Sequence, residues 1–167
     1  NNKDKPEEVV AIVNGKEIKS KNVKAIKEAQ EIMNINKSEK EIIETIIIDH
    51  LLLKEAEKHN ITVTDEEVNN IIEFQKEALS NNKETYSELT DYVKALDMTE
   101  EEYWQMLRPI YKKRAILGKH KQLLKEEFIN SNKNSLNKNT NINNLFEEYY
   151  IEYKGNLLKN ADVKILY

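Results

Sequence analysis

Three copies of a helix-start motif divide the chain. Ser38–Glu41, Thr64–Glu67 and Thr99–Glu102 each place a Ser or Thr three residues before a Glu. In such a capping box, the hydroxyl and the carboxylate accept bonds from each other's free backbone amides, and a helix begins directly after it. The 167 residues include only 3 Gly and 2 Pro, which leaves few tight turns. The sequence therefore predicts a mainly α protein with several long helices.

Apolar side chains follow each motif at helical spacing. The segment from Glu39 to about Lys58 carries a broad apolar face, which is typical of a central helix covered on more than one side. The longest predicted helix runs from Thr99 to about Asn130. Pro109 lies inside it and is expected to kink this helix without ending it, because the apolar rhythm continues beyond the proline. Further helices are predicted from Ser20 to about Asn34, from the capping box at Thr64 to about Ser80, over 86–96 and from Leu145.

Two short β-type runs lie near the ends of the chain. Val9–Val13 is followed by Asn14-Gly15, which suits a type I′ turn and predicts a hairpin; a loose turn before a helix is the alternative. A two-stranded hairpin is only marginally stable alone. Val163–Leu166 is the best candidate for a third strand. We therefore expect one small sheet that joins the first and last strands.

The composition predicts four regions. They are a polar leader over 1–8, a helical core with the hairpin over 9–130, an Asn-rich linker over 131–144, and a last helix and strand over 145–167 that pack back on the core. The leader begins without Met, so a targeting signal or lipid anchor is expected to have preceded it. No run reaches the roughly 20 apolar residues of a membrane span.

Several short motifs resemble one known family. They are the hairpin sequence Val13–Ile18 (VNGKEI), the helix end Leu52–Lys58 (LLKEAEK), the connection Asn60–Val68 (NITVTDEEV), and the close Ala161–Leu166 (ADVKIL). Together they are similar to the chaperone module of SurA/PrsA-type foldases. Asn60 stands where that family usually has Gly, a mild departure because Asn also tolerates a left-handed helix end.

The resemblance implies a chaperone that holds unfolded or extended polypeptide clients outside the bacterial cytoplasm, at the cell surface or tethered by an N-terminal membrane anchor. Many relatives carry a parvulin prolyl isomerase domain between the long helix and the last helix. Here only 130–144 fills that place, which is too short for an enzyme. The resemblance therefore implies a foldase-like protein without isomerase activity.

Catalytic, metal and cofactor sites are not expected. The chain has no Cys, and His50, His59 and His120 show no ligand spacing. Each acidic pair lies in the first turn of a predicted helix, where it stabilises the helix dipole. The net charge is −4, and the basic residues between Arg108 and Lys125 are interpreted as a solvated face, so nucleic acid is not an expected partner.

Aromatic residues and a Met are the candidates for client binding, because they make adaptable apolar contacts. The predicted cleft is lined by Tyr103, Trp104, Met106, Tyr111, Tyr149, Tyr150 and Tyr153. The alternative is that these side chains form the core between the long helix and the last helix. A competing functional hypothesis is a structural or assembly module, which binds one dedicated protein partner or forms a homodimer by exchanging the last helix through the linker.

Overall fold

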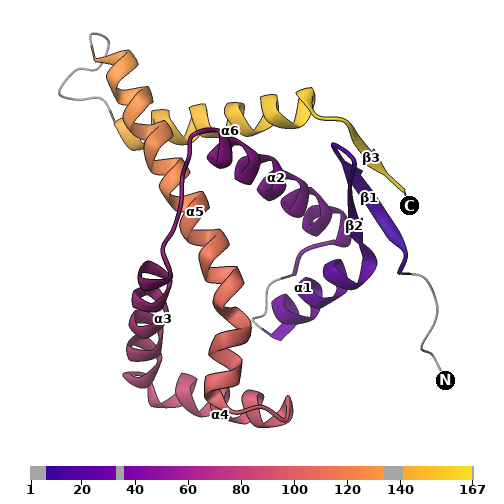
Figure 1. The fold of residues 1–167 in the computed structure, drawn as a ribbon, viewed down its shortest axis with the longest axis vertical. Helices are drawn as coiled ribbons and strands as arrows, with labels where there is room; N and C mark the ends of the chain where they lie inside the picture. The colour runs from indigo at the N-terminus through magenta and orange to yellow at the C-terminus, as the bar shows by residue number, and fades with distance from the viewer. Residues whose placement is uncertain (1–6, 33–35, 134–140, 167) are drawn as a thin grey trace. The chain divides into compact units, whose positions relative to one another are not determined.

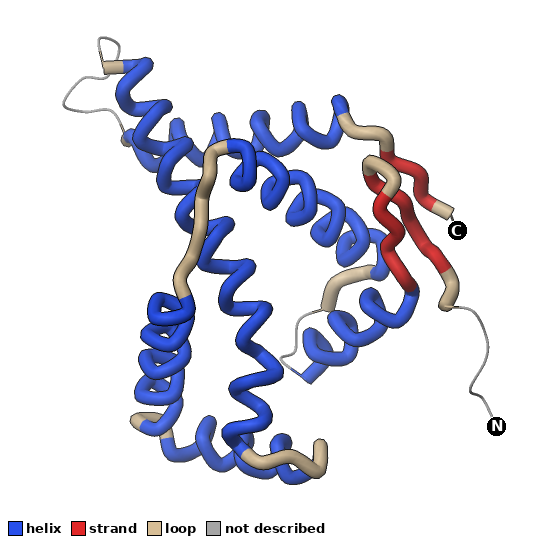
Figure 2. The backbone as a smooth tube through the Cα atoms, viewed as in Figure 1, coloured by secondary structure: helices blue, strands red, loops and turns tan. Residues whose placement is uncertain are grey.

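The computed structural model describes residues 7–32, 36–133 and 141–166 (Figure 1). In these ranges it contains six helices and three strands, which confirms the mainly α prediction (Figure 2). In chain order they are β1 (Val9–Val13), β2 (Lys16–Lys19), α1 (Ser20–Ile32), α2 (Glu39–Lys58), α3 (Asp65–Ser80), α4 (Lys83–Ala95), α5 (Glu100–Asn132), α6 (Ile142–Asn160) and β3 (Val163–Ile165).

The chain divides into two compact units. Unit 1 combines Asn1–Lys54 with Glu127–Tyr167, and unit 2 is the continuous segment Glu55–Glu126. The chain passes from one unit to the other inside α2 and inside α5. Each unit has its own cluster of buried apolar side chains.

The sheet of unit 1 has the predicted form. Strand β1 lies in the middle and pairs antiparallel with both β2 and β3. Asn14 and Gly15 connect β1 to β2 with positive φ values of 47° and 81°, as a type I′ turn requires. The hairpin is therefore confirmed over the loose turn, and so is the pairing of the first strand with the last.

The core of unit 1 lies between the sheet and α2. Ala11 and Val13 of β1 are fully buried, together with Ile42, Ile43 and Ile47 of α2. Leu157 and Leu158 of α6 pack against the same cluster. The broad apolar face that the sequence predicts for α2 therefore meets neighbours in this core, as expected for a central helix.

Unit 2 begins at a well-defined helix end. Asn60 adopts φ of 55°, the left-handed conformation expected from its place in the motif. The amide of Ile61 donates to the carbonyl of Ala56 at 3.0 Å, and the amide of Asn60 donates to that of Glu57 at 3.0 Å. This pair of bonds is a Schellman motif, which satisfies the last carbonyls of α2 and turns the chain toward α3.

All three capping boxes form. Thr64 and Glu67 bond reciprocally at the start of α3. The amide of Glu41 donates to the Ser38 hydroxyl at 3.3 Å, and the amide of Thr99 donates to the Glu102 carboxylate at 2.7 Å. Helix α5 continues past Pro109 to Asn132, so the proline does not end it.

The two helices beside the Asn-rich segment extend further than the sequence predicts. Helix α5 reaches Asn132, and α6 begins at Ile142, three residues before the predicted start at Leu145. The reason is a cap: the side chain of Asn141 accepts a bond from the amide of Asn144 at 3.2 Å. Residues 134–140 of the predicted linker and residues 1–6 of the predicted leader lie outside the described residues.

Within the described part of the chain, no helix combines the length and apolarity needed to cross a membrane.

The link between the Asn60–Thr64 connection and α5 predicts a pH dependence of stability. Lys119 of α5 pairs with the Glu67 carboxylate at 2.5 Å and also donates to the Thr62 carbonyl at 3.0 Å. Hydrogen bonding to Lys119, and then to the amide of Thr64, lowers the pKa of Glu67 from its usual 4.5. The stabilisation is therefore present above that value and is lost as the pH falls through the lower folded-state pKa.

We expect Glu67→Gln to unfold at a lower temperature than the wild type at pH 7, with the gap narrowing as the pH falls below 4.5, because the lowered pKa of Glu67 makes its stabilisation depend on the charged form. Circular dichroism melts across this range measure the gap. Glu66→Gln is the matched control, because Glu66 is exposed in the same helical turn. A gap that stays constant from pH 7 to pH 3 would contradict this account of the carboxylate.

Candidate functional site

The core of unit 2 is built around Trp104. The capping box at Thr99 starts α5 and places the indole in its second turn, facing α3. Trp104 is only 2% exposed and shares a cluster with Val63, Val68 and Ile72. The apolar face predicted for α3 is therefore the face that covers this indole.

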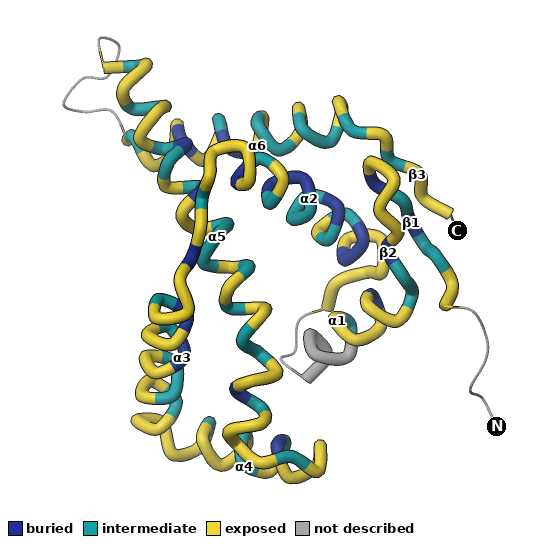
Figure 3. Tube along the Cα trace, viewed as in Figure 1, coloured by how far each residue is buried: buried dark blue, intermediate teal, exposed yellow. Residues whose placement is uncertain are grey.

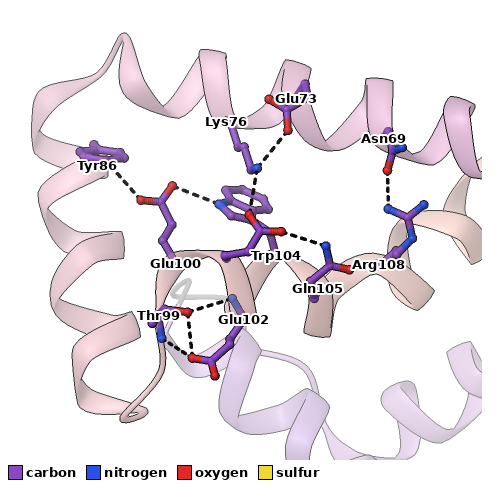
Figure 4. A network of polar contacts seen from close by, with 11 residues as sticks. Asn69, Glu73, Lys76, Tyr86, Thr99, Glu100, Glu102, Trp104, Gln105 and Arg108 are labelled. Carbon is purple, nitrogen blue, oxygen red and sulfur yellow. Dashed lines mark hydrogen bonds and ion pairs between the residues drawn. The ribbon is translucent and has the colours of Figure 1, made fainter.

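Polar side chains lie beside and over the Trp104 ring (Figure 4). The indole Nε1–H donates to Glu100 at 3.1 Å, and the other oxygen of Glu100 accepts from the Tyr86 hydroxyl at 2.9 Å. Lys76 Nζ stands 5.9 Å from the ring centroid and pairs with Glu73 at 2.9 Å. These contacts hold α3, α4 and the start of α5 together around one ring.

Tyr103 and Tyr111 flank Trp104 and are half-buried. The Tyr103 and Trp104 rings meet edge to face at 5.5 Å between centroids, and Trp104 stacks on Tyr111 at 6.5 Å. Burial raises the pKa of both phenols above the usual 10.0. Both therefore stay neutral in the physiological range and act as apolar surfaces that each carry one hydroxyl.

Met106 differs from its aromatic neighbours because it points outward. It is 48% exposed, and Ile110, one turn further along α5, is 45% exposed. Residues four apart lie on the same face of a helix. Unit 2 therefore presents an apolar strip on α5, although Trp104 itself lies in the core. A client would have to displace present neighbours to reach the indole.

The remaining predicted residues belong to unit 1. Tyr149, Tyr150 and Tyr153 of α6 form an aromatic cluster with Phe128 and Phe146. Phe146 and Tyr150 are buried, and burial is the main cause that raises the pKa of Tyr150. The predicted residues thus divide between unit 2 and unit 1. The single cleft that they were predicted to line stays a prediction.

The sequence reasoning missed a groove on unit 2. It lies beside α3 with a volume of about 580 Å³, and its lining includes Glu73, Phe74, Lys76, Glu77, Tyr86 and Glu100. We call it the α3 groove. Phe74 is 67% exposed, and α3 is exposed along one side only (Figure 3). The sequence offered one signal of this groove. Phe74 lies between the polar residues Glu73 and Gln75, off the apolar face that carries Val68 and Ile72.

Some of the basic side chains of α5 make contacts inside unit 2. Arg108 donates to the side chain of Asn69 and lies 3.7 Å from the carboxylate of Asp65, while Lys119 pairs with Glu67.

The rings of His59 and His120 lie 5.5 Å apart between centroids. Among the described residues, no group of three or more His, Asp or Glu side chains is placed to hold a metal ion.

Comparison with known proteins identifies the family. The profile of the family described as SurA-like N-terminal domain matches residues 1–114. The chain belongs to this family. Those residues include the VNGKEI hairpin, the Asn60 helix end, the α3 groove and the Trp104 cluster.

Two relatives show how far the similarity extends. The chaperone SurA of Buchnera aphidicola subsp. Schizaphis graminum (strain Sg) is 31% identical over 106 residues, covering 52% of this chain and 24% of that protein. The chain thus matches about a quarter of that relative's length. A solved structure from work on PEB4 and Cj1289, described as two SurA-like chaperones of Campylobacter jejuni, has a TM-score of 0.43 and 16% identity. That match covers 76% of this chain and 50% of the other.

The bond between Glu100 and Trp104 predicts a stability difference between two variants. Glu100→Ala leaves the buried indole N–H without its acceptor, which costs about 1–3 kcal/mol. Glu100→Gln keeps a side-chain oxygen and is expected to cost less. Urea unfolding followed by the fluorescence of Trp104, the single Trp of the chain, measures both values.

Tyr86→Phe is the control, because it removes the other bond to Glu100 and keeps the one to Trp104. Equal losses for Glu100→Ala and Glu100→Gln would show that the acceptor oxygen does not stabilise unit 2.

Proposed function

We propose that this chain is a chaperone that binds unfolded or extended polypeptide segments reversibly through apolar surface on unit 2. Membership of the SurA-like N-terminal domain family carries the proposal, because the curated relative is itself named a chaperone. The exposed side chains of Phe74, Met106 and Ile110 supply the surface that such an activity requires.

The binding energy would come from apolar burial. Each Å² of apolar surface removed from water contributes about 25 cal/mol, so small contacts give weak, reversible binding without ATP. Met106 suits this role, because its unbranched side chain adapts to many partners. Tyr103 and Tyr111, half-buried on the same helix, would extend the contact.

We further propose that the chain acts without prolyl isomerase activity and outside the cytoplasm, where a membrane anchor would tether it. Only residues 133–141 separate α5 from α6, where related foldases carry their catalytic domain. The chain would then hold clients without isomerising their prolyl peptide bonds.

The proposal is tested by the aggregation of a chemically denatured model protein, measured by light scattering with increasing amounts of this chain. We expect suppression near a stoichiometric ratio. The double variant Met106→Ser with Ile110→Ser should need a several-fold higher ratio, because it replaces exposed apolar contacts with hydroxyls. Both side chains are exposed, so the core should remain intact.

Ile151→Ser is the matched control, since Ile151 is 65% exposed on α6 of unit 1. No suppression by the wild type would refute the proposal. Binding of a single tight partner, or a stable dimer that exchanges α6, would instead favour the assembly-module hypothesis.

A further inference from the structure

The α3 groove combines an apolar anchor with uneven charge. Single exposed apolar residues are common on protein surfaces and need no special explanation. Phe74 differs because it lines a concave surface together with the ring of Tyr86. The two rings come from different helices, α3 and α4, so the groove depends on the folded unit.

The charge of the groove is negative. Its described lining contains Glu73, Glu77 and Glu100 and a single cation, Lys76. Lys76 is already engaged, because it pairs with Glu73 at 2.9 Å and lies 3.8 Å from Glu101. These two carboxylates raise the pKa of Lys76 and keep it charged.

Lys76 forms ion pairs with Glu73 and Glu101, and Glu100 contributes less than these two carboxylates to raising its pKa. Glu100 accepts bonds from the Tyr86 hydroxyl and the Trp104 indole, both of which are uncharged donors. Glu77 lines the groove three residues after Phe74, on the same face of α3. The aromatic surface therefore lies between negative charges.

We propose that the α3 groove binds segments of unfolded polypeptide in which Lys or Arg adjoins an aromatic or large aliphatic residue. The inference rests on the proposed chaperone function and specifies its clients. The apolar side chain of the segment packs on Phe74 and Tyr86, and the cation lies near Glu77 and Glu100. An acidic segment meets the same apolar surface with like charge and is disfavoured.

Trp104 reports on occupancy of this groove. Glu100 lines the groove and also accepts the hydrogen bond of the Trp104 indole N–H. A client cation near Glu100 therefore changes the field at the ring. Because Trp104 is the single Trp, its fluorescence gives a direct titration signal with peptides that lack Trp.

The test uses three blocked, unstructured peptides of equal length. The first pairs Arg with Phe, the second replaces Arg by Glu, and the third replaces Phe by Ala. The Arg-Phe peptide should bind about tenfold more tightly than either of the others, because each lacks one of the two contacts. Its advantage over the Glu-Phe peptide should shrink as salt is added, because salt screens surface charge.

Two variants locate the binding. Phe74→Ala removes the apolar anchor and should lower the affinity for the Arg-Phe peptide about tenfold. Glu77→Lys replaces a negative charge of the groove by a positive one. It should weaken binding of the Arg-Phe peptide roughly fivefold and strengthen binding of the Glu-Phe peptide. Glu88→Lys on α4 is the charge-matched control and should leave the ranking of the three peptides by affinity unchanged. Circular dichroism confirms that each variant is folded.

Equal affinity for the Arg-Phe and Glu-Phe peptides would overturn the inference, and so would unchanged binding in Phe74→Ala and Glu77→Lys. The aggregation assay with the same proteins separates this failure from that of the proposed function. If the wild type still suppresses aggregation, the groove proposal alone is refuted. If it does not, the chaperone function itself is refuted.

Discussion

Unit 1 is closed by the pairing of β1 with β3, two strands about 150 positions apart in sequence. Asn14 has two roles in this closure. Its positive φ makes the β1–β2 turn, and its side-chain oxygen accepts from the amide of Asp162 at 3.0 Å. Its own amide donates to the Asp162 carbonyl at 2.8 Å. The pairing brings α6 onto the α2 core and joins the two segments between which residues 55–126 are inserted.

In unit 2, the residues that stabilise the fold are different from the apolar residues that are exposed on its surface. The Schellman turn at Asn60 and the Thr64 capping box set the course of α3, whose apolar face then covers Trp104. The opposite part of α3 leaves Phe74 in contact with water. Because the core is complete without Phe74, Met106 and Ile110, the proposed binding and release of clients through these side chains would not require unit 2 to unfold. A holding chaperone needs this combination of a stable core and an available apolar surface.

Local chemistry explains which features the sequence predicts. The hairpin, the capping boxes and the left-handed Asn60 each depend on a few adjacent residues, so they can be predicted without the rest of the chain. The burial of Trp104 depends instead on α3, which lies some 30 residues earlier, and periodicity within α5 does not reveal it. Phe74 was missed for a related reason: it lies off the apolar face, and only the folded position of Tyr86 and Glu100 makes a groove around it.

Hydrogen–deuterium exchange in the presence of a permanently unfolded client tests most directly whether unit 2 holds unfolded chains. The account predicts slower amide exchange in α3 and in the first turns of α5, around Phe74 and Met106, when the client is added. Exchange in the β1–β3 sheet should not change. Unaltered exchange throughout unit 2, or slowing confined to unit 1, would contradict the account.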